Sequence, residues 1–123
     1  MVNTHGPVHV VVVEDEEDLR ELLVFALEVA KFEVHAAGSL AEARSLLLTG
    51  ERHADVLVAD YGLPDGTGAD LLELCADARP RVCILLSGHD ARDIPAAGFD
   101  LVLTKPVTPE KLVSAIHASF PER

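Results

Sequence analysis

The stretch that decides the fold is residues 9–15, which read HVVVVED. Its apolar part, His9–Val13, is almost pure valine, and β-branched residues favour an extended strand. A strand that is apolar on both faces is typical of the interior of a parallel sheet. Two carboxylates, Glu14 and Asp15, follow at the point where this strand would end. The sequence therefore predicts a buried strand with acidic residues at its carboxyl end.

Four further short apolar runs follow along the chain, at residues 32–36, 55–59, 82–86 and 101–104. The run at 32–36 alternates between apolar and polar residues, which indicates a half-exposed strand at a sheet edge. Between the runs, apolar residues recur at helical spacing. The predicted apolar stripes are Leu19, Leu22, Leu23, Ala26, Leu27 and Ala30, then Leu40, Ala43 and Leu47, then Leu71, Leu74, Cys75 and Ala78, and finally Leu112, Ile116 and Phe120. A weaker helical segment around 91–97 contains Pro95.

Strands that alternate with helices require crossover connections and produce a parallel sheet covered on both faces. The predicted fold is therefore α/β, a single doubly wound (βα)5 domain with a five-stranded parallel sheet. A chain of 123 residues has the length of one domain. We expect the domain to span residues 8–120, with short tails at 1–7 and 121–123.

The charge balance excludes several classes of partner. Acidic residues number 21 and basic residues 10, which gives a formal charge of −11. Nucleic acids and anionic membranes require a basic surface, so neither is an expected direct partner. The first residues resemble no signal peptide, and we expect a cytoplasmic protein. Cys75 and Cys83 are expected to be small buried hydrophobic residues in a reducing compartment.

Reactive side chains follow four of the five apolar runs. Glu14 and Asp15 follow the first run, and Asp60, Ser87 and Lys105 follow the third, fourth and fifth. The carboxyl ends of parallel strands share one edge of the sheet, which is where such folds bind ligands. Three carboxylates brought together repel one another unless a cation joins them, and Mg²⁺ prefers such oxygen ligands.

Lysine and serine beside a metal-binding carboxylate cluster suit a phosphoryl group. Lys105 supplies a fixed positive charge and Ser87 a hydroxyl donor, and phosphoryl transfer depends mainly on such charge neutralisation. A carboxylate can itself act as the nucleophile and form an aspartyl phosphate. Asp60 is the best candidate, because it ends the central strand and precedes a loop containing Gly62 and Gly66.

Four segments together resemble the receiver domain of bacterial two-component response regulators. They are residues 11–16, 60–68, 85–88 and 103–106, in order and with similar spacing, and the resemblance covers residues 8–120. It implies the flavodoxin-like strand order 2-1-3-4-5, which the single-domain chemotaxis regulators of this family share. It also implies a role in a phosphorelay, in which a histidine kinase or a histidine phosphotransfer protein donates the phosphoryl group.

The resemblance implies a role for each residue of the cluster. Asp60 matches the phosphoacceptor, Ser87 the switch hydroxyl and Lys105 the lysine that pairs with the phosphoryl group. The Mg²⁺ ligands would be Asp15 directly, Glu14 often through water, Asp60, and the backbone carbonyl of Gly62, with Mn²⁺ able to substitute for Mg²⁺. Pro106 matches a residue whose peptide bond family members often hold cis. The implied protein is not an enzyme beyond catalysing its own phosphorylation and dephosphorylation. We expect a monomer or weak dimer.

The sequence departs from the family pattern at the switch. An aromatic residue usually stands three positions before the lysine, where this chain has Val102. The segment between Ser87 and Lys105 is also short and contains Pro95, so the predicted fourth helix is short or distorted. Gly62 and His89 occupy the positions that commonly tune loss of the phosphoryl group. In the family, the downstream partner binds the face made by the fourth helix, fifth strand and fifth helix.

Three alternatives stay open at this point. A degenerate receiver would bind its partner without phosphorylation, which the missing aromatic at Val102 allows. A phosphatase of the haloacid-dehalogenase type also uses an aspartyl phosphate, but it needs a second acid two residues later, where this chain has Gly62. A flavin-binding domain needs a hydroxyl-rich phosphate loop after the first strand, and residues 14–17 are all acidic here.

Overall fold

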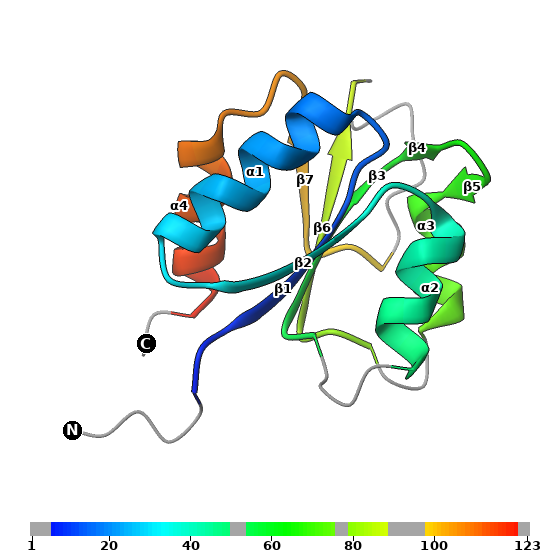
Figure 1. Ribbon diagram of the computed structural model, residues 1–123, viewed down its shortest axis with the longest axis horizontal. Coiled ribbons are helices and arrows are strands. Elements are labelled where there is room, and N and C mark those ends of the chain that lie inside the picture. The colour runs from blue at the N-terminus through cyan, green and yellow to red at the C-terminus, as the bar shows by residue number, and fades with distance from the viewer. Residues whose placement is uncertain (1–5, 50–53, 76–78, 89–97, 121–123) are drawn as a thin grey trace.

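Five strands form one parallel sheet in the order β2-β1-β3-β6-β7 (Figure 1). The computed structural model describes residues 6–49, 54–75, 79–88 and 98–120. The strands are β1 (His9–Val13), β2 (Glu33–Ala37), β3 (Val56–Asp60), β6 (Val82–Ser87) and β7 (Leu101–Thr104). Counting these five alone, the order is 2-1-3-4-5, as the sequence resemblance implied. The half-exposed second strand lies at the edge, as predicted.

Helices cover both faces of the sheet (Figure 1). On one face lie α1 (Glu17–Val29) and α4 (Pro109–Ser119), and on the other lie α2 (Leu40–Thr49) and α3 (Gly68–Leu74). Alternate side chains of β1 enter the two cores: Val10 and Val12 pack on the α1 and α4 side, and Val11 and Val13 on the other. The doubly wound α/β architecture is confirmed. The predicted helix around 91–97 lies outside the described residues.

Local hydrogen bonds explain where the helices begin. The Thr108 hydroxyl accepts from the backbone N–H of Lys111, and a proline occupies the first turn of α4. Thr67 and Asp70 form a reciprocal capping box at the start of α3. The Ser39 hydroxyl accepts from the N–H of Glu42 at 3.2 Å just before α2 begins.

The apolar stripe predicted for α1 is partly wrong. Leu23 and Leu27 are fully buried, but Leu22 is 50% exposed. Successive helical residues are rotated by about 100°, so Leu22 points away from the face that Leu23 and Leu27 share. Together with Phe25 and Val29, which are 66% and 62% exposed, it forms a second apolar stripe on the outer surface. We call Leu22, Phe25 and Val29 the outer α1 stripe.

The chain between β3 and β6 also differs from the prediction. The sequence predicts a loop over residues 60–68, but this segment contains two short antiparallel strands, β4 (Gly62–Leu63) and β5 (Gly66–Thr67). Helix α3 ends at Leu74, and Ala78 of the predicted stripe lies outside the described residues. Leu74 is 36% exposed, whereas Leu71 and Cys75 are buried, so the core-facing side of α3 is narrower than expected.

Strand boundaries shift by one residue in three strands. β2 and β3 begin and end one residue later than predicted, and β6 ends one residue later, so Asp60 and Ser87 are the last residues of their strands. Cys75 and Cys83 are free and buried, as expected. Within the described residues, no helix is long and apolar enough to cross a membrane.

Candidate phosphoryl and metal site

The predicted reactive residues converge at the carboxyl edge of the sheet. Glu14 follows β1, Asp60 ends β3, Ser87 ends β6 and Lys105 follows β7. The Lys105 Nζ atom lies 2.9 Å from Glu14 Oε1 and 3.2 Å from Asp60 Oδ2, so one ammonium group joins two carboxylates from different strands. Parallel pairing of β1, β3, β6 and β7 brings these side chains together, because it aligns their carboxyl ends.

Three carboxylates form an acidic triad: Glu14, Asp15 and Asp60. Each offers an oxygen atom, and these atoms lie within 4.8 Å of one another. Glu14 and Asp60 are buried, whereas Asp15 is exposed. Like charges this close disfavour one another's ionised form, particularly where water is excluded. The triad therefore favours a bound cation more than an ordinary acidic surface does.

Glu14 shows this most clearly. Its side chain is fully buried, and Oε2 accepts a hydrogen bond from the Glu16 N–H at 3.1 Å. Oε1 accepts no aligned hydrogen bond from any described residue, although Lys105 approaches it as an ion pair. Burial raises the pKa of the Glu14 carboxyl, and nearby Asp60 adds to this, while Lys105 and the Glu16 N–H partly offset it. A buried carboxylate oxygen lacking a full set of donors fits a divalent cation.

Lys105 stays charged in this setting. Burial alone would lower the pKa of its amine, but contacts with Glu14 and Asp60 outweigh burial and raise that pKa. Its backbone is also fixed, because the Lys105 N–H donates to the Ser87 carbonyl oxygen at 2.7 Å. The peptide bond between Lys105 and Pro106 is cis, as the resemblance implied.

Ser87 and Gly62 flank Asp60. Ser87 is fully buried at the end of β6, the strand that pairs with β3. Gly62 begins β4 two residues after Asp60, and a side chain at this position would meet open space. The backbone of Tyr61 ties the two strands together, since its N–H donates to the Leu86 carbonyl oxygen at 2.9 Å. Both predicted residues therefore lie near Asp60, Gly62 along the chain and Ser87 on the neighbouring strand. The ligand role of the Gly62 carbonyl stays a prediction.

Sequence reasoning missed two polar residues around this site. Asp65, at the β4–β5 turn, accepts the backbone N–H groups of Leu40 at 2.7 Å and Ala41 at 3.0 Å. These bonds to the first turn of α2 lower the pKa of the Asp65 carboxyl. Arg20 in α1 donates to the Glu14 carbonyl oxygen at 2.9 Å. Asp65 lies 25 residues from its partner Leu40 in the sequence, and no local sequence pattern predicts a contact over that separation.

Two features of the predicted switch have different outcomes. Val102 lies in β7 and is half-buried, so the usual aromatic side chain is absent from that position. His89 and Pro95 lie outside the described residues. The downstream face is therefore described only where it involves β7 and α4.

A doubly wound sheet whose carboxyl edge gathers acidic side chains and a lysine is the architecture of a phosphorelay receiver. Residues 10–117 match the family model described as the response regulator receiver domain, and the chain belongs to that family. Proteins of this family act in two-component signalling, in general with histidine kinases and downstream effectors, and they bind Mg²⁺ through acidic residues.

Individual relatives agree with this assignment. The chain is 34% identical over 102 residues to the response regulator protein PilR of Pseudomonas aeruginosa, covering 78% of this chain and 22% of PilR. It is 29% identical over 117 residues to the phosphate regulon transcriptional regulatory protein PhoB of the same organism, covering 89% of this chain and 50% of PhoB. The chain thus spans half or less of the length of these relatives.

Solved structures show the same fold. A response regulator receiver domain protein from Clostridium thermocellum superposes with a TM-score of 0.81 at 28% identity, covering 93% of this chain and 94% of that one. A CheY-like receiver domain protein from Methanospirillum hungatei gives a TM-score of 0.84 at 24% identity, covering 95% and 96%.

Proposed function

We propose that this protein accepts a phosphoryl group on Asp60 in a Mg²⁺-dependent reaction, from a phosphohistidine of a histidine kinase or a histidine phosphotransfer protein. The observation that carries the proposal is the position of the Lys105 ammonium between Glu14 and Asp60, at the edge of the acidic triad. An intact set of charges of this kind is what phosphoryl transfer needs from a protein.

In the proposed reaction, a carboxylate oxygen of Asp60 attacks the phosphorus atom. A new P–O bond forms as the P–N bond to the donor imidazole breaks, and the imidazole keeps that electron pair and takes up a proton. The Lys105 ammonium compensates the charge on the transferred oxygens, and the Ser87 hydroxyl donates a hydrogen bond to one of them. The protein modifies only itself, so we do not class it as an enzyme.

The metal would be held by Glu14, Asp15, Asp60 and the Gly62 backbone carbonyl. Bound Mg²⁺, or Mn²⁺ in its place, supplies positive charge that offsets the repulsion between the carboxylates and the incoming phosphoryl oxygens. Glu14 Oε1 supports this assignment, because this buried acceptor has the Lys105 ammonium as an ion-pair neighbour but accepts no aligned hydrogen bond from a described residue. Like the predicted cytoplasmic location and the monomeric or weakly dimeric state, the ligand set stays a proposal.

Phosphorylation would add roughly −1.5 to −2 charges at one point. Movement of Ser87 and Lys105 toward that charge would bias the face formed by β7, α4 and the segment between Ser87 and β7. We propose that a downstream partner reads this face. Because Val102 replaces the usual aromatic residue, we expect the signal to pass through the Ser87 hydroxyl and the backbone of β7.

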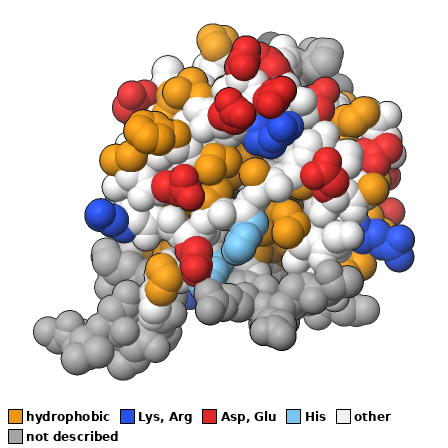
Figure 2. All heavy atoms as spheres, in the orientation of Figure 1, with side chains coloured by type: hydrophobic (Ala, Val, Ile, Leu, Met, Phe, Trp, Pro, Cys, Tyr) orange, Lys and Arg blue, Asp and Glu red, His pale blue; other side chains and the backbone are white. Residues whose placement is uncertain are grey.

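The outer α1 stripe supports docking of a phosphodonor protein. Leu22, Phe25 and Val29 expose apolar surface on the helix that follows the acidic pair Glu14 and Asp15. Figure 2 shows acidic and hydrophobic side chains side by side on this part of the molecule. We expect Phe25→Ser to slow transfer from a phosphorylated kinase but to leave labelling by acetyl phosphate unchanged. Equal kinase rates in both proteins would contradict this docking role.

Beryllofluoride, which mimics a phosphoryl group on a carboxylate, tests the proposed function. Amide NMR spectra of the unaltered protein should shift around Asp60, Ser87 and Lys105 when beryllofluoride and Mg²⁺ are added together, and not with beryllofluoride alone. Asp60→Asn should show no such shift. Unchanged spectra of the unaltered protein under both conditions would favour a phosphorylation-independent interaction module. Turnover of unrelated phosphoesters would instead favour the phosphatase alternative.

A further inference from the structure

Arg20 contacts the acidic loop at residues 14–16, which leads from β1 into α1. Its side chain rises from the first turns of α1, and Nη1 donates to the backbone carbonyl oxygen of Glu14 at 2.9 Å. The N–H of the same residue, Glu14, donates to the Ala37 carbonyl oxygen at 3.0 Å. The Glu14 backbone is therefore held on one side by α1 and on the other by the end of β2.

Gly38 provides the space that this contact needs. A Cβ atom at Gly38 would lie 2.9 Å from Arg20 Nη1 and 3.6 Å from Cζ, so the guanidinium group passes directly over the glycine. Real Cβ contacts are longer than the first of these distances, and the easiest relief is displacement of the flexible arginine tip. The loop after β2 thus fixes where the Arg20 side chain can lie.

We propose that Arg20, whose guanidinium group lies against Gly38, is a positioning residue for the proposed Mg²⁺ ligands Glu14 and Asp15. By holding the Glu14 carbonyl, it keeps the loop at residues 14–16 oriented so that the Glu14 and Asp15 carboxylates converge on Asp60. This inference rests on the proposed Mg²⁺ site and adds to it a residue that touches neither the metal nor the phosphoryl group. Partners that orient metal ligands typically contribute about 10–100-fold in affinity.

The sign of the effect separates positioning from simple electrostatics. Arg20 carries a positive charge close to a site for a cation. If its charge alone mattered, removing it would strengthen Mg²⁺ binding, because like charges repel. If Arg20 orients the carboxylates, removing it weakens Mg²⁺ binding. The two explanations therefore predict opposite changes in the same measurement.

The chain supplies a local probe for this measurement. Tyr61 is the only tyrosine and there is no tryptophan, so intrinsic fluorescence reports from the residue next to Asp60. The experiment is a Mg²⁺ titration of Tyr61 emission in the unaltered protein, in Arg20→Ala, in Gly38→Ala and in the double variant. Arg44→Ala, which removes an exposed arginine from α2, is the matched control for loss of one positive charge.

We expect Arg20→Ala to weaken Mg²⁺ binding by about tenfold or more. Gly38→Ala should weaken it in the same direction while keeping the charge, because the added methyl group displaces the guanidinium. The double variant should be no weaker than Arg20→Ala, since the methyl group has nothing left to displace. Arg44→Ala should bind Mg²⁺ as the unaltered protein does. Urea unfolding in EDTA identifies any variant whose loss comes from unfolding.

Two results would overturn the inference. Unchanged or tighter Mg²⁺ binding by folded Arg20→Ala would show that Arg20 acts at most through its charge. Independent, additive losses in the double variant would show that Gly38→Ala does not act through Arg20. If the unaltered protein itself bound no Mg²⁺, the proposed function would fail, and the role of Arg20 with it.

Discussion

The two ends of the sheet use carboxylates in opposite ways. At the amino end, the Asp55 carboxylate accepts the His9 N–H at 2.8 Å, and the Asp100 carboxylate accepts the Cys83 N–H at 2.7 Å. Each of these acids completes the hydrogen bonding of a strand. At the carboxyl end, Glu14 and Asp60 are buried beside each other and share one lysine. The first arrangement stabilises the fold, whereas the second stores repulsion that a cation can relieve.

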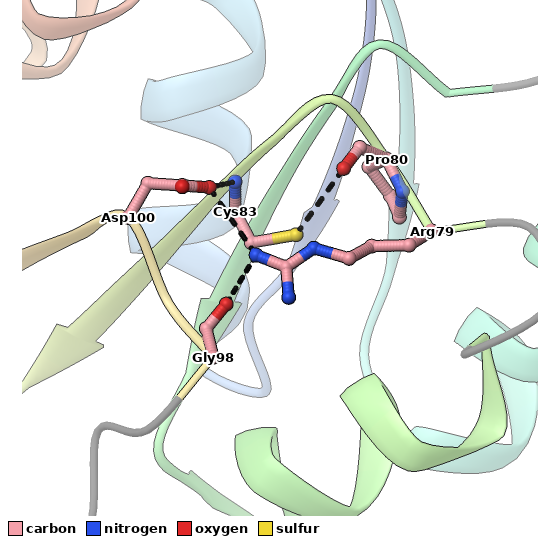
Figure 3. A network of polar contacts seen from close by, with 5 residues as sticks. All are labelled: Arg79, Pro80, Cys83, Gly98 and Asp100. Carbon is pink, nitrogen blue, oxygen red and sulfur yellow. Dashed lines mark hydrogen bonds and ion pairs between the residues drawn. The ribbon is translucent and has the colours of Figure 1, made fainter.

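Figure 3 shows how complete the amino-end contacts are. Arg79 reaches across from the chain before β6 to the Gly98 carbonyl oxygen and to the Asp100 carboxylate, which lies 3.4 Å away. The Cys83 thiol is directed to the Pro80 carbonyl oxygen at 3.7 Å. These contacts join the segments that lead into β6 and β7. Charge near a strand end therefore indicates function only where the carboxylates lack sufficient partners.

The largest expected effect comes from removing a carboxylate at the amino end of the sheet. Asp100→Ala leaves the Cys83 N–H without its acceptor and removes the partner of Arg79. We expect the free energy of unfolding to fall by about 2 kcal/mol, the usual scale for a lost hydrogen bond to a charged group. Urea denaturation measures this change. Mg²⁺ affinity should be unaltered, and a large loss of Mg²⁺ binding by the folded variant would contradict the separation of the two ends.

The second prediction concerns the carboxyl end of the sheet, where a substitution should raise the free energy of unfolding. Glu14→Gln removes a buried charge, so in EDTA at neutral pH we expect a gain in unfolding free energy that is smaller than the loss in Asp100→Ala. The same substitution should weaken Mg²⁺ binding. Denaturation with and without Mg²⁺ measures both effects. A lower free energy of unfolding for Glu14→Gln in EDTA would contradict the claim that the ionised Glu14 side chain destabilises the fold.

The pH dependence of this gain follows from the raised pKa of Glu14. The folded protein holds a proton on Glu14 at pH values where the unfolded chain has released it. The protonated Glu14 carboxyl therefore contributes to the free energy of unfolding. This contribution is fully present below the ordinary glutamate pKa and is lost as pH rises through the raised pKa. The advantage of Glu14→Gln over the unaltered protein should shrink as pH falls through this window.

A smaller effect is expected at the turn that links the site to α2. Asp65→Ala removes the acceptor for the Leu40 and Ala41 N–H groups, and we expect a modest fall in the urea midpoint, because Asp65 is exposed. Its lowered pKa makes this contribution present above the ordinary aspartate pKa and lost as pH falls through the lowered value. Asp65→Asn is the matched control, and its midpoint should lie between the other two.

The smallest expected effect concerns the two buried cysteines, which should not react with an alkylating reagent in the native protein. Burial raises the pKa of the Cys83 thiol to about 11, and it also raises the pKa of Cys75. Only the thiolate reacts with alkylating reagents, so native protein at about pH 8 should stay unlabelled while denatured protein takes up reagent at both cysteines. Mass spectrometry after brief iodoacetamide treatment checks this. Rapid labelling of native Cys83 would show that the amino end opens readily.

Much of the fold could be predicted because its signals are local. Valine-rich runs and apolar residues at helical spacing act over a few residues, and strands and helices form where these signals lie. The convergence of Glu14, Asp60 and Lys105 was also predictable, because parallel strands bring their carboxyl ends to one edge. The resemblance then supplied the roles of these residues, which periodicity alone does not reveal.

The failures were of a different kind. Leu22 matched the helical stripe by spacing, but only tertiary packing decides which side of an apolar helix faces the core. The short β4–β5 hairpin and the reach of Asp65 to α2 depend on segments far apart in the sequence. Arg20 was overlooked because a lone arginine in an acidic helix has no distinctive pattern. Its contact with the Glu14 carbonyl appears only in three dimensions.

The most direct test of the central claim is to find where a phosphoryl group goes. The protein is incubated with acetyl phosphate, with and without Mg²⁺, and its intact mass and peptide fragments are then measured. We predict one added phosphoryl group, dependent on Mg²⁺ and located on Asp60, that is absent from Asp60→Asn. Phosphorylation at another residue, or an equal adduct on Asp60→Asn, would contradict the assignment of Asp60 as the acceptor.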